Sequence, residues 1–337
     1  VAGLAVAPAA RARALRPLPP DDADPQRWGL GRAATWRLSV RTEPNRDADL
    51  VTYIYEDDVV PILAAVQGGA EPAHNRVWYQ LEQGFVHSGW VQPVAYEFQT
   101  PLHAWPGSGF LVEVSIPFVD ARWNAHPLGS VAYRMYYGAV FWVIDVATDV
   151  SGEVWYRIWD ERRRKAYYVP GNAVRRIPDA ELTPISPQVP REDKRLYVDS
   201  AAQIVIAYED TGAVMAAPAA TGAWYFEDGV WKDYTTTPGL YHIGRKMPSR
   251  HMAGGDLAAA DGFDLPGVPW VSYFSLSGMA FHGTYWHNDY GKPRSHGCVN
   301  VTPEAARWIY RWTTPHAPPN EDMVWAKDGN GTIVEVV

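Results

Sequence analysis

Short hydrophobic runs separated by polar turn residues dominate the first part of the chain. Between Trp36 and Val94 these runs lie at residues 38–40, 59–66, 77–81 and 89–91. Apolar runs of this length, bounded by Gly, Pro, Asp and Asn, are typical of the strands of a small β-barrel. The pattern therefore predicts a first β-module over residues 35–94.

The same pattern returns about 80 residues later. Residues 77–81 (VWYQL) are matched by residues 154–158 (VWYRI), the run at 59–66 by 140–147, and the run at 89–91 by 167–169. Repetition of one supersecondary unit explains such spacing. We expect a second module over residues 131–177, with residues 95–130 as a connecting segment.

Proline marks the next boundary, because it stiffens the chain and removes backbone donors. It predicts a linker over residues 178–193, which contains Pro178, Pro184, Pro187 and Pro190.

Residues 194–337 are predicted to form a mainly β domain. Apolar runs at 195–198, 203–208 and 214–217, broken by the acidic turn at 209–212, indicate strands joined by tight turns. A helix is predicted over residues 303–312, because Thr302 can cap its first turn and Pro303 suits the first helical position. Its apolar face would contain Ala305, Ile309 and Trp312.

Composition and charge narrow the class of protein. Hydrophobic residues make up 47% of the chain and charged residues 20%, as in an ordinary folded soluble protein. The net charge of -8 argues against a nucleic-acid partner, because binding to phosphates requires a high density of Lys and Arg. The sequence also contains no apolar stretch long enough to span a bilayer.

The N-terminal residues indicate export. Residues 1–14 are Ala-rich and resemble the end of a signal peptide, although a flexible terminus would look similar. Residues 17–27, rich in Pro and Asp, are typical of a disordered spacer. We therefore interpret residues 1–34 as a signal-peptide remnant and spacer of a protein of the cell envelope or extracellular space. Whether residues 1–14 are cleaved is left open.

Candidate chemistry gathers around Cys298, the only cysteine of the chain. A thiol becomes a strong nucleophile when a nearby imidazole generates its thiolate, and His282 and His296 are candidates for that role. Gly297 indicates an unusual backbone or a close approach by substrate. A buried structural cysteine and a zinc site made of Cys298, His282 and His296 are the alternatives, but no metal-ligand spacing supports the second.

These residues carry a resemblance to a known family. The run Ser295-His296-Gly297-Cys298-Val299-Asn300, with His282-Gly283 upstream, resembles the signature of L,D-transpeptidases of the YkuD-like family. Residues 236–243 (TTPGLYHI) resemble a strand of the same family, and the resemblance covers residues 194–327. The two N-terminal modules resemble bacterial Src-homology-3-like modules, which bind cell-wall peptide or position a catalytic domain.

The resemblance implies a role for each residue of the signature. Cys298 would be the nucleophile and His282 the general base, with the Gly283 carbonyl orienting the imidazole. Backbone amides around His296, Gly297 and Cys298 would hold the oxyanion. His296 would either orient the loop or transfer protons. No metal and no cofactor is implied.

Substrate-binding residues are expected beside this signature. Ser295 and Asn300 would shape the loop. Tyr285, Trp286, His287 and Tyr290 would line the donor site, and Asp289 would form a turn. These assignments are made without a motif for the segment 284–294, which is short for the family and implies a reduced cap over the groove.

The implied fold is mainly β, with a β-sandwich-like L,D-transpeptidase domain preceded by two small barrels. The implied function is peptidoglycan L,D-transpeptidation, which joins a donor and an acceptor stem peptide through a thioester. An L,D-carboxypeptidase, a wall-peptide Cys endopeptidase and a non-catalytic wall-binding protein are the alternatives. Expected partners are peptidoglycan stem peptides, with wall binding through the N-terminal modules. The diamino acid of the stem, the acceptor, the ligand of the barrels and the oligomeric state are left open.

Overall fold

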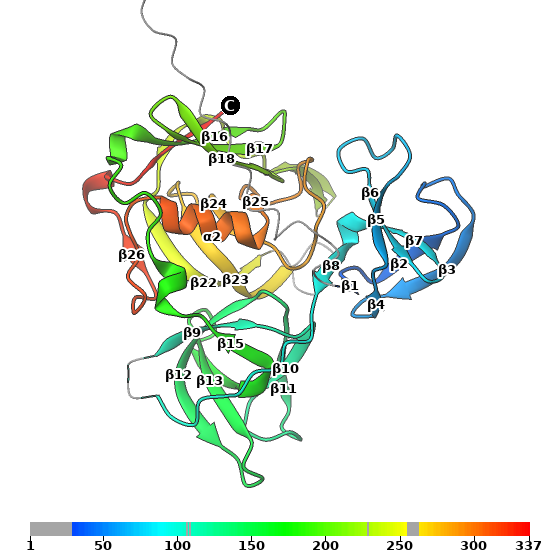
Figure 1. The fold of residues 1–337 in the computed structure, drawn as a ribbon. Coiled ribbons are helices and arrows are strands. Elements are labelled where there is room, and N and C mark those ends of the chain that lie inside the picture. Colours follow the sequence, from blue (N-terminus) through cyan, green and yellow to red (C-terminus); the bar gives the residue numbers. More distant parts are fainter. Residues whose placement is uncertain (1–28, 106, 108, 228, 255–262) are drawn as a thin grey trace, which may run out of the picture.

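The structure, a computed structural model, describes residues 29–105, 107, 109–227, 229–254 and 263–337. Figure 1 shows three β-rich bodies: a first module in blue and cyan, a second in green, and a C-terminal domain that ends in red. The predicted mainly β fold is confirmed, because strands build all three bodies and α2 is the one α-helix of the described residues. The predicted signal-peptide remnant lies outside the described residues.

The first module (residues 30–94) contains two sheets, with the strand orders β4-β1-β8 and β3-β2-β7-β6-β5. Successive side chains of a strand point to opposite faces, so Leu38 and Val40 of β2 are buried while Arg37 and Arg41 face outward. A 3₁₀ turn, η2 (Ser88–Trp90), precedes its last strand. The strands are β1 (Leu30–Ala33), β2 (Arg37–Arg41), β3 (Leu50–Tyr55), β4 (Val59–Pro61), β5 (Ala64–Gln67), β6 (Val77–Leu81), β7 (Gly84–His87) and β8 (Val91–Val94).

The second module (residues 110–176) is one seven-stranded sheet, in the order β11-β10-β14-β13-β12-β9-β15. The turn η3 (Gly171–Ala173) precedes its last strand, as η2 does in the first module. The strands are β9 (Phe110–Val114), β10 (Phe118–Arg122), β11 (Val131–Tyr136), β12 (Val140–Thr148), β13 (Val154–Asp160), β14 (Lys165–Pro170) and β15 (Val174–Arg176).

Strand pairing in the second module repeats that of the first. β9 pairs with β15 and β12, as β1 pairs with β8 and β4. β13 pairs with β12 and β14, as β6 pairs with β5 and β7. β10 pairs with β11 and β14, as β2 pairs with β3 and β7. The spacing of about 80 residues in the sequence therefore corresponds to a repeat of the whole pairing scheme.

The repeat corrects the predicted boundaries. Residues 95–130 are not only a connecting segment, because β9 and β10 lie within them and complete the second sheet. Residues 30–34 do not belong to a spacer, because β1 pairs with β4 and β8 and buries Ala33. The linker at 178–193 also contributes to packing, since Leu182 is buried in the core of the C-terminal domain.

The C-terminal domain (residues 194–336) contains two five-stranded sheets, in the orders β18-β17-β16-β27-β21 and β25-β24-β23-β22-β26, and the hairpin β19-β20. Figure 1 shows α2 between the two sheets. Its strands are β16 (Lys194–Asp199), β17 (Ile204–Glu209), β18 (Gly212–Pro218), β19 (Trp224–Glu227), β20 (Val230–Asp233), β21 (Gly239–His242), β22 (Arg245–Gly254), β23 (Phe263–Tyr273), β24 (Ala280–Gly283), β25 (Val299–Val301), β26 (Val324–Trp325) and β27 (Ile333–Val336). Short 3₁₀ turns are η4 (Asp179–Leu182), η5 (Arg191–Asp193) and η6 (Lys327–Gly329).

The helix α2 (Pro303–Trp312) has the predicted bounds and the predicted cap, because the Thr302 side chain accepts a hydrogen bond from an amide of the first turn. At its other end, buried Lys194 and Lys246 donate to the carbonyl oxygens of Trp312 (2.9 Å) and Thr313 (3.0 Å). Buried lysine N–H donors at this position satisfy the terminal carbonyls of the helix.

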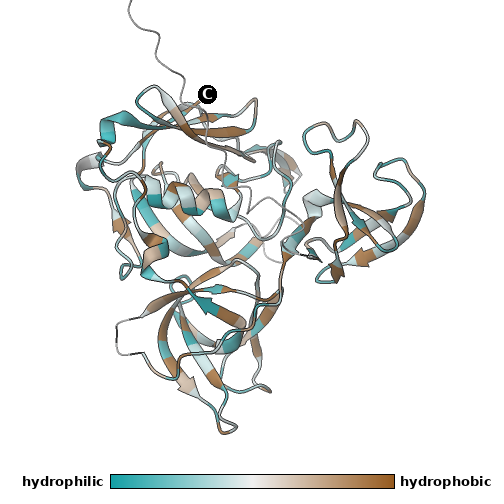
Figure 2. Cartoon of the chain, viewed as in Figure 1, coloured by the Kyte–Doolittle hydropathy of each residue, from teal (hydrophilic) through white to brown (hydrophobic). Residues whose placement is uncertain are grey.

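The distribution of hydropathy agrees with this architecture. Figure 2 shows hydrophobic and hydrophilic residues interspersed along the strands of all three bodies. Across the residues that the structure describes, no helix combines the length and hydrophobicity needed to cross a membrane.

Candidate active site

His282 lies in β24, and Cys298 is the residue directly before the neighbouring strand β25. β24 and β25 pair in parallel, with Phe281 opposite Val299 and His282 opposite Asn300. Phe281 and Val299 point into the main core, so the alternating residues Cys298, Asn300 and His282 face the other side of the sheet. The parallel register thus gives the thiol and the imidazole a common face.

Hydrogen bonding fixes the His282 imidazole in one orientation and one tautomer. The ring is buried, and its Nδ1 lies 3.0 Å from the carbonyl oxygen of Gly283. A carbonyl only accepts, so Nδ1 carries the proton and Nε2 presents a lone pair. Burial lowers the pKa of His282 to about 4, which the bond to Gly283 only partly opposes. At neutral pH the ring is therefore an uncharged acceptor.

Cys298 is partly exposed but has apolar surroundings. It packs at the edge of a cluster that includes Met247, Val271 and Ala280, and its Sγ lies 3.8 Å from the carbonyl oxygen of Gly278. Burial raises the pKa of the thiol to about 11, although a hydrogen bond from the Ala280 backbone opposes the shift. The resting sulfur is therefore a neutral thiol at pH 7.

The loop before Cys298 is tightly hydrogen-bonded. The Ser295 hydroxyl donates to the Cys298 carbonyl and accepts from the Gly297 N–H at 3.1 Å, while Thr236 Oγ1 donates to the Gly297 carbonyl at 3.0 Å. Gly297 has φ +110, a conformation that side chains rarely adopt. The Gly297 amide already donates to Ser295 in this structure. The amides of His296 and Cys298 are the remaining donors of the predicted set.

His296 lies in an aromatic setting that the sequence does not indicate. Its ring stacks on Tyr225, with centroids 4.4 Å apart and an interplanar angle of 3°, and meets Tyr234 edge-on at 4.7 Å. Its Nε2 lies 3.1 Å from Glu227 Oε1. Tyr225 and Glu227 belong to the hairpin β19-β20, about 70 residues earlier, and no motif in that hairpin marks them. These contacts favour an orienting role for His296 over proton transfer.

Three predicted groove residues, Tyr285, His287 and Tyr290, are buried instead. The Tyr290 hydroxyl donates to the Val301 carbonyl at 3.1 Å. Tyr285 is 2% exposed and packs in the core of the second module, with its hydroxyl on the Pro266 carbonyl at 2.8 Å. His287 is also buried, and its Nδ1 accepts from the Asp289 amide at 3.2 Å. The prediction of groove residues is corrected at all three positions, because the short segment 284–294 packs against the modules and does not lie open over the sheet. Trp286 stays near the site, with its ring centroid 5.9 Å from that of His282.

Asn300 links this segment to the catalytic sheet. Its amide lies 3.1 Å from His287 Nε2, which carries the ring proton because Nδ1 accepts from Asp289. The amide nitrogen stands at this position and Oδ1 has no partner within the described ranges, so the bond requires the amide to be turned over, with its oxygen accepting from Nε2. Because Asn300 is the strand partner of His282, the bond ties residues 287–289 to the imidazole-bearing strand.

The comparison with protein families decides the identity of this domain. Residues 193–336 match the family model YkuD, described as the L,D-transpeptidase catalytic domain. The C-terminal domain belongs to the YkuD family. The match leaves both N-terminal modules outside it.

Solved structures of L,D-transpeptidases resemble the chain. The enzyme of Xylanimonas cellulosilytica is 24% identical, with 43% of this chain and 60% of that chain covered and a TM-score of 0.29. The L,D-transpeptidase of Enterococcus faecium is 17% identical, with 43% of this chain and 50% of that chain covered and a TM-score of 0.31. The L,D-transpeptidase of Mycobacterium smegmatis is 15% identical, with 57% of this chain and 98% of that chain covered and a TM-score of 0.33. The matched part thus spans 60% and 50% of the length of the first two proteins. A sequence comparison with curated proteins finds no match.

The first module contacts the YkuD domain through Asp289. This carboxylate is 2% exposed and pairs with His74 of the first module at 2.8 Å, with Lys292 at 3.0 Å, and with Arg294. Gly89 approaches so closely that an added Cβ would lie 2.7 Å from Asp289 Oδ1. Asp289 was expected to form a turn. It instead contacts His74 across the boundary between the two bodies.

All three bodies meet at Arg32. Its buried guanidinium bonds Gln92 at 2.8 Å and Asp57 at 3.0 Å within the first module, and the Tyr285 carbonyl of the YkuD domain at 2.7 Å. It also lies over the ring of Tyr136 in the second module, 4.1 Å from the centroid. A buried guanidinium requires several acceptors, and only the assembled bodies supply them. The modules therefore hold the start of the segment that follows His282.

Proposed function

We propose that the YkuD domain is a peptidoglycan L,D-transpeptidase with Cys298 as nucleophile and His282 as general base. The observation that carries this proposal is that His282 of β24 and Cys298, directly before β25, lie on the same side of the sheet, with Nδ1 of the imidazole already bonded to Gly283. An imidazole held in this tautomer offers Nε2 to a neutral thiol.

In the first half-reaction, His282 Nε2 takes the thiol proton while Sγ attacks the carbonyl of the bond between the diamino acid and the terminal D-Ala. The tetrahedral intermediate collapses, the C–N bond breaks, and the imidazolium returns the proton to the departing D-Ala amine. A thioester between Cys298 and the donor stem remains. The amides of His296 and Cys298 are the proposed oxyanion donors.

In the second half-reaction, an amine of a neighbouring stem attacks the thioester. His282 accepts a proton from the amine, and the thiol of Cys298 is released with that proton. The product is a 3-3 cross-link. Water in place of the amine would give an L,D-carboxypeptidase, which differs from the transpeptidase only in the acceptor.

We further propose that the protein acts outside the cell, since its proposed substrate is the cell wall. The two modules, which the resemblance relates to Src-homology-3-like barrels, would attach it to the wall. Ser295 and Asn300 would act through the shape of the loop and strand that carry the thiol. Trp286 is the groove residue whose contact with His282 supports a role beside the substrate.

The test is intact-protein mass spectrometry after incubation with a donor tetrapeptide that ends in D-Ala. The expected increase in protein mass equals the mass of the donor minus the mass of D-Ala, because the thiol hydrogen leaves with D-Ala, and the adduct should be absent in Cys298→Ala. Analysis of muropeptides from the same reaction should show new links. Loss of existing links without new ones would favour an endopeptidase, and an adduct that persists in Cys298→Ala would end the proposal.

A further inference from the structure

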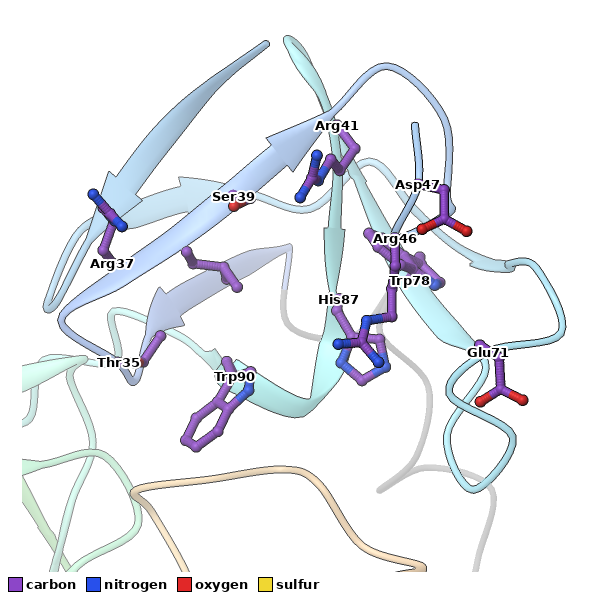
Figure 3. A pocket seen from close by; sticks show the side chains of 11 residues that line it. Thr35, Arg37, Ser39, Arg41, Arg46, Asp47, Glu71, Trp78, His87 and Trp90 are labelled. Atoms are coloured by element: carbon purple, nitrogen blue, oxygen red, sulfur yellow. The ribbon is translucent and has the colours of Figure 1, made fainter. Parts of the chain in front are cut away.

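A buried histidine lies between two carboxylates where the second module meets the YkuD domain. Nδ1 of His251, in β22, lies 2.8 Å from Oδ2 of Asp160 at the end of β13, and Nε2 contacts Oδ1 of Asp264 in β23. The imidazole and the Asp160 carboxylate are buried, whereas the Asp264 side chain is 25% exposed. This cluster is distinct from the pocket of about 640 Å³ in Figure 3, whose lining residues belong to the first module.

The arrangement requires the imidazole to carry two protons. An ionised carboxylate only accepts, so each ring nitrogen of His251 has to donate to its partner. A neutral imidazole has one N–H and would direct its remaining lone pair at a carboxylate. Burial lowers the pKa of His251, but the hydrogen bonds to Asp160 and Asp264 outweigh this effect and raise the pKa above its usual 6.5. The contact is therefore complete only while His251 is protonated.

Among the described residues, three carboxylates and two guanidiniums surround the ring. Arg163 pairs with Asp264 at 2.8 Å, and Arg250 pairs with Glu161 at 2.9 Å. Glu161 also accepts the backbone N–H of His251 at 3.1 Å. Together with Asp160, these side chains sum to one negative charge, which a protonated His251 balances. The neighbouring phenols have a pKa that burial raises, so they are uncharged near neutral pH: Tyr133, which meets the ring edge-on, and Tyr167.

Strand β23 reaches the active site with its other face. Successive side chains of a strand point to opposite faces, so Phe263 and Leu265 share the face opposite to Asp264. Leu265 packs in the cluster that includes Cys298. The ring of Phe263 meets the ring of His296 at a centroid distance of 5.3 Å. Asp264 therefore anchors β23 at the point where its two neighbours contact the surroundings of the thiol.

We propose that protonated His251 is a positioning residue for the active site, because it fixes β23 against the second module and so holds Phe263 on the ring of His296. The consequence for the reaction rests on the proposed function, since the His296 amide is a proposed oxyanion donor. A small displacement of such a donor lowers the rate of acylation. The second module would thus affect catalysis through this contact and not through binding of the substrate.

Loss of the proton should release the Asp264 side of the cluster. When the proton leaves Nε2, Nδ1 keeps its hydrogen bond to Asp160, whose buried carboxylate also accepts the backbone N–H groups of residues 162 and 163. Asp264 then faces a lone pair and can turn toward water. Because the pKa of His251 is raised on folding, the contact is complete below pH 6.5 and is lost as the pH rises through the folded pKa.

The first test is an NMR titration of the full chain, isotopically labelled at its histidine rings, from pH 5 to pH 9. Assignments come from His251→Gln and His296→Gln. We expect His251 to titrate above pH 6.5 and the His296 resonances to shift at the same midpoint. This shift of His296 should be absent in Asp264→Asn and retained in the control Asp120→Asn, whose carboxylate pairs with Arg134 elsewhere in the second module. A His296 ring that does not respond at the His251 midpoint would overturn the proposal.

The adduct assay measures the consequence for the reaction. At pH 6 the adduct should form about tenfold more slowly in Asp264→Asn than in the native chain, and the two rates should converge above the folded pKa of His251. Asp120→Asn should follow the native profile. A ratio of the two rates that does not change with pH would contradict the positioning role, because a merely structural effect does not depend on the proton of His251. If the native chain forms no adduct, the proposed function fails, while the NMR titration still decides whether His251 positions His296.

Discussion

Alkylation of Cys298 should accelerate steadily with pH, without a plateau near neutrality. The chain has one cysteine, so uptake of iodoacetamide reports on this sulfur alone. The thiolate is the reactive form, and burial raises the pKa of Cys298 to about 11. At pH 7 about one molecule in 10⁴ would carry the thiolate, and the rate should rise about tenfold per pH unit up to about pH 10.

The free energy of proton transfer from Cys298 to His282 decides whether the two groups form a neutral pair or an ion pair. Moving the proton from the thiol, with a pKa of about 11, to the imidazole, with a pKa of about 4, costs about 9.5 kcal/mol. Attraction between the resulting charges returns only about 4 kcal/mol at 4 Å and an effective dielectric constant of 20. The neutral pair is therefore favoured by about 5 kcal/mol, and the thiolate has to form during attack on the substrate.

The assay measures the alkylation rate by mass spectrometry from pH 5 to pH 10, for the native chain, His282→Gln and the control His296→Gln. Neither substitution should change the slope of the native profile. A plateau between pH 5 and pH 8 that is lost in His282→Gln would refute the reasoning, because it would reveal a thiolate–imidazolium pair.

Three further predictions concern stability. Asp289→Asn should lower the free energy of unfolding by about 3 kcal/mol or more, because it leaves Arg294 and His74 without a buried carboxylate. Chemical denaturation measures this loss, and a loss below about 1 kcal/mol would count against the link between the bodies. Gly297→Ala should lower the free energy of unfolding by about 1–3 kcal/mol, because the residue has a φ of +110. A steric clash is not the cause, since the nearest atom to an added Cβ is 3.7 Å away. The melting temperature of the variant should fall accordingly. Burial lowers the pKa of His287 to about 3, so the unfolded chain binds more protons than the folded chain below pH 6.5. The neutral ring therefore contributes fully to stability above pH 6.5, and this contribution declines by up to about 5 kcal/mol toward pH 3. His287→Gln should flatten the measured dependence of the free energy of unfolding on pH.

Local patterns in the sequence are enough for the helix, for several of the strands and for the signature, although they missed β1, β9 and β10. The helix at 303–312 follows from Thr302 and Pro303, because capping and first-turn preferences act within a few residues. The offset of about 80 residues between the modules is visible because equivalent strands use similar residues. The match of residues 193–336 to the YkuD family agrees with the signature around Cys298.

Tertiary structure alone decides what surrounds that signature. Tyr285 and His287 look like groove residues in sequence, but packing against the modules buries them. Glu227 and Tyr225 reach His296 from a hairpin with no motif, and Arg32 finds its acceptors in three separate bodies. The raised pKa of the thiol and the lowered pKa of the imidazole likewise arise from burial. The sequence determined which groups are present and their local backbone, whereas long-range packing determined their solvent access and partners, because desolvation and contacts between distant segments leave no local pattern in the chain.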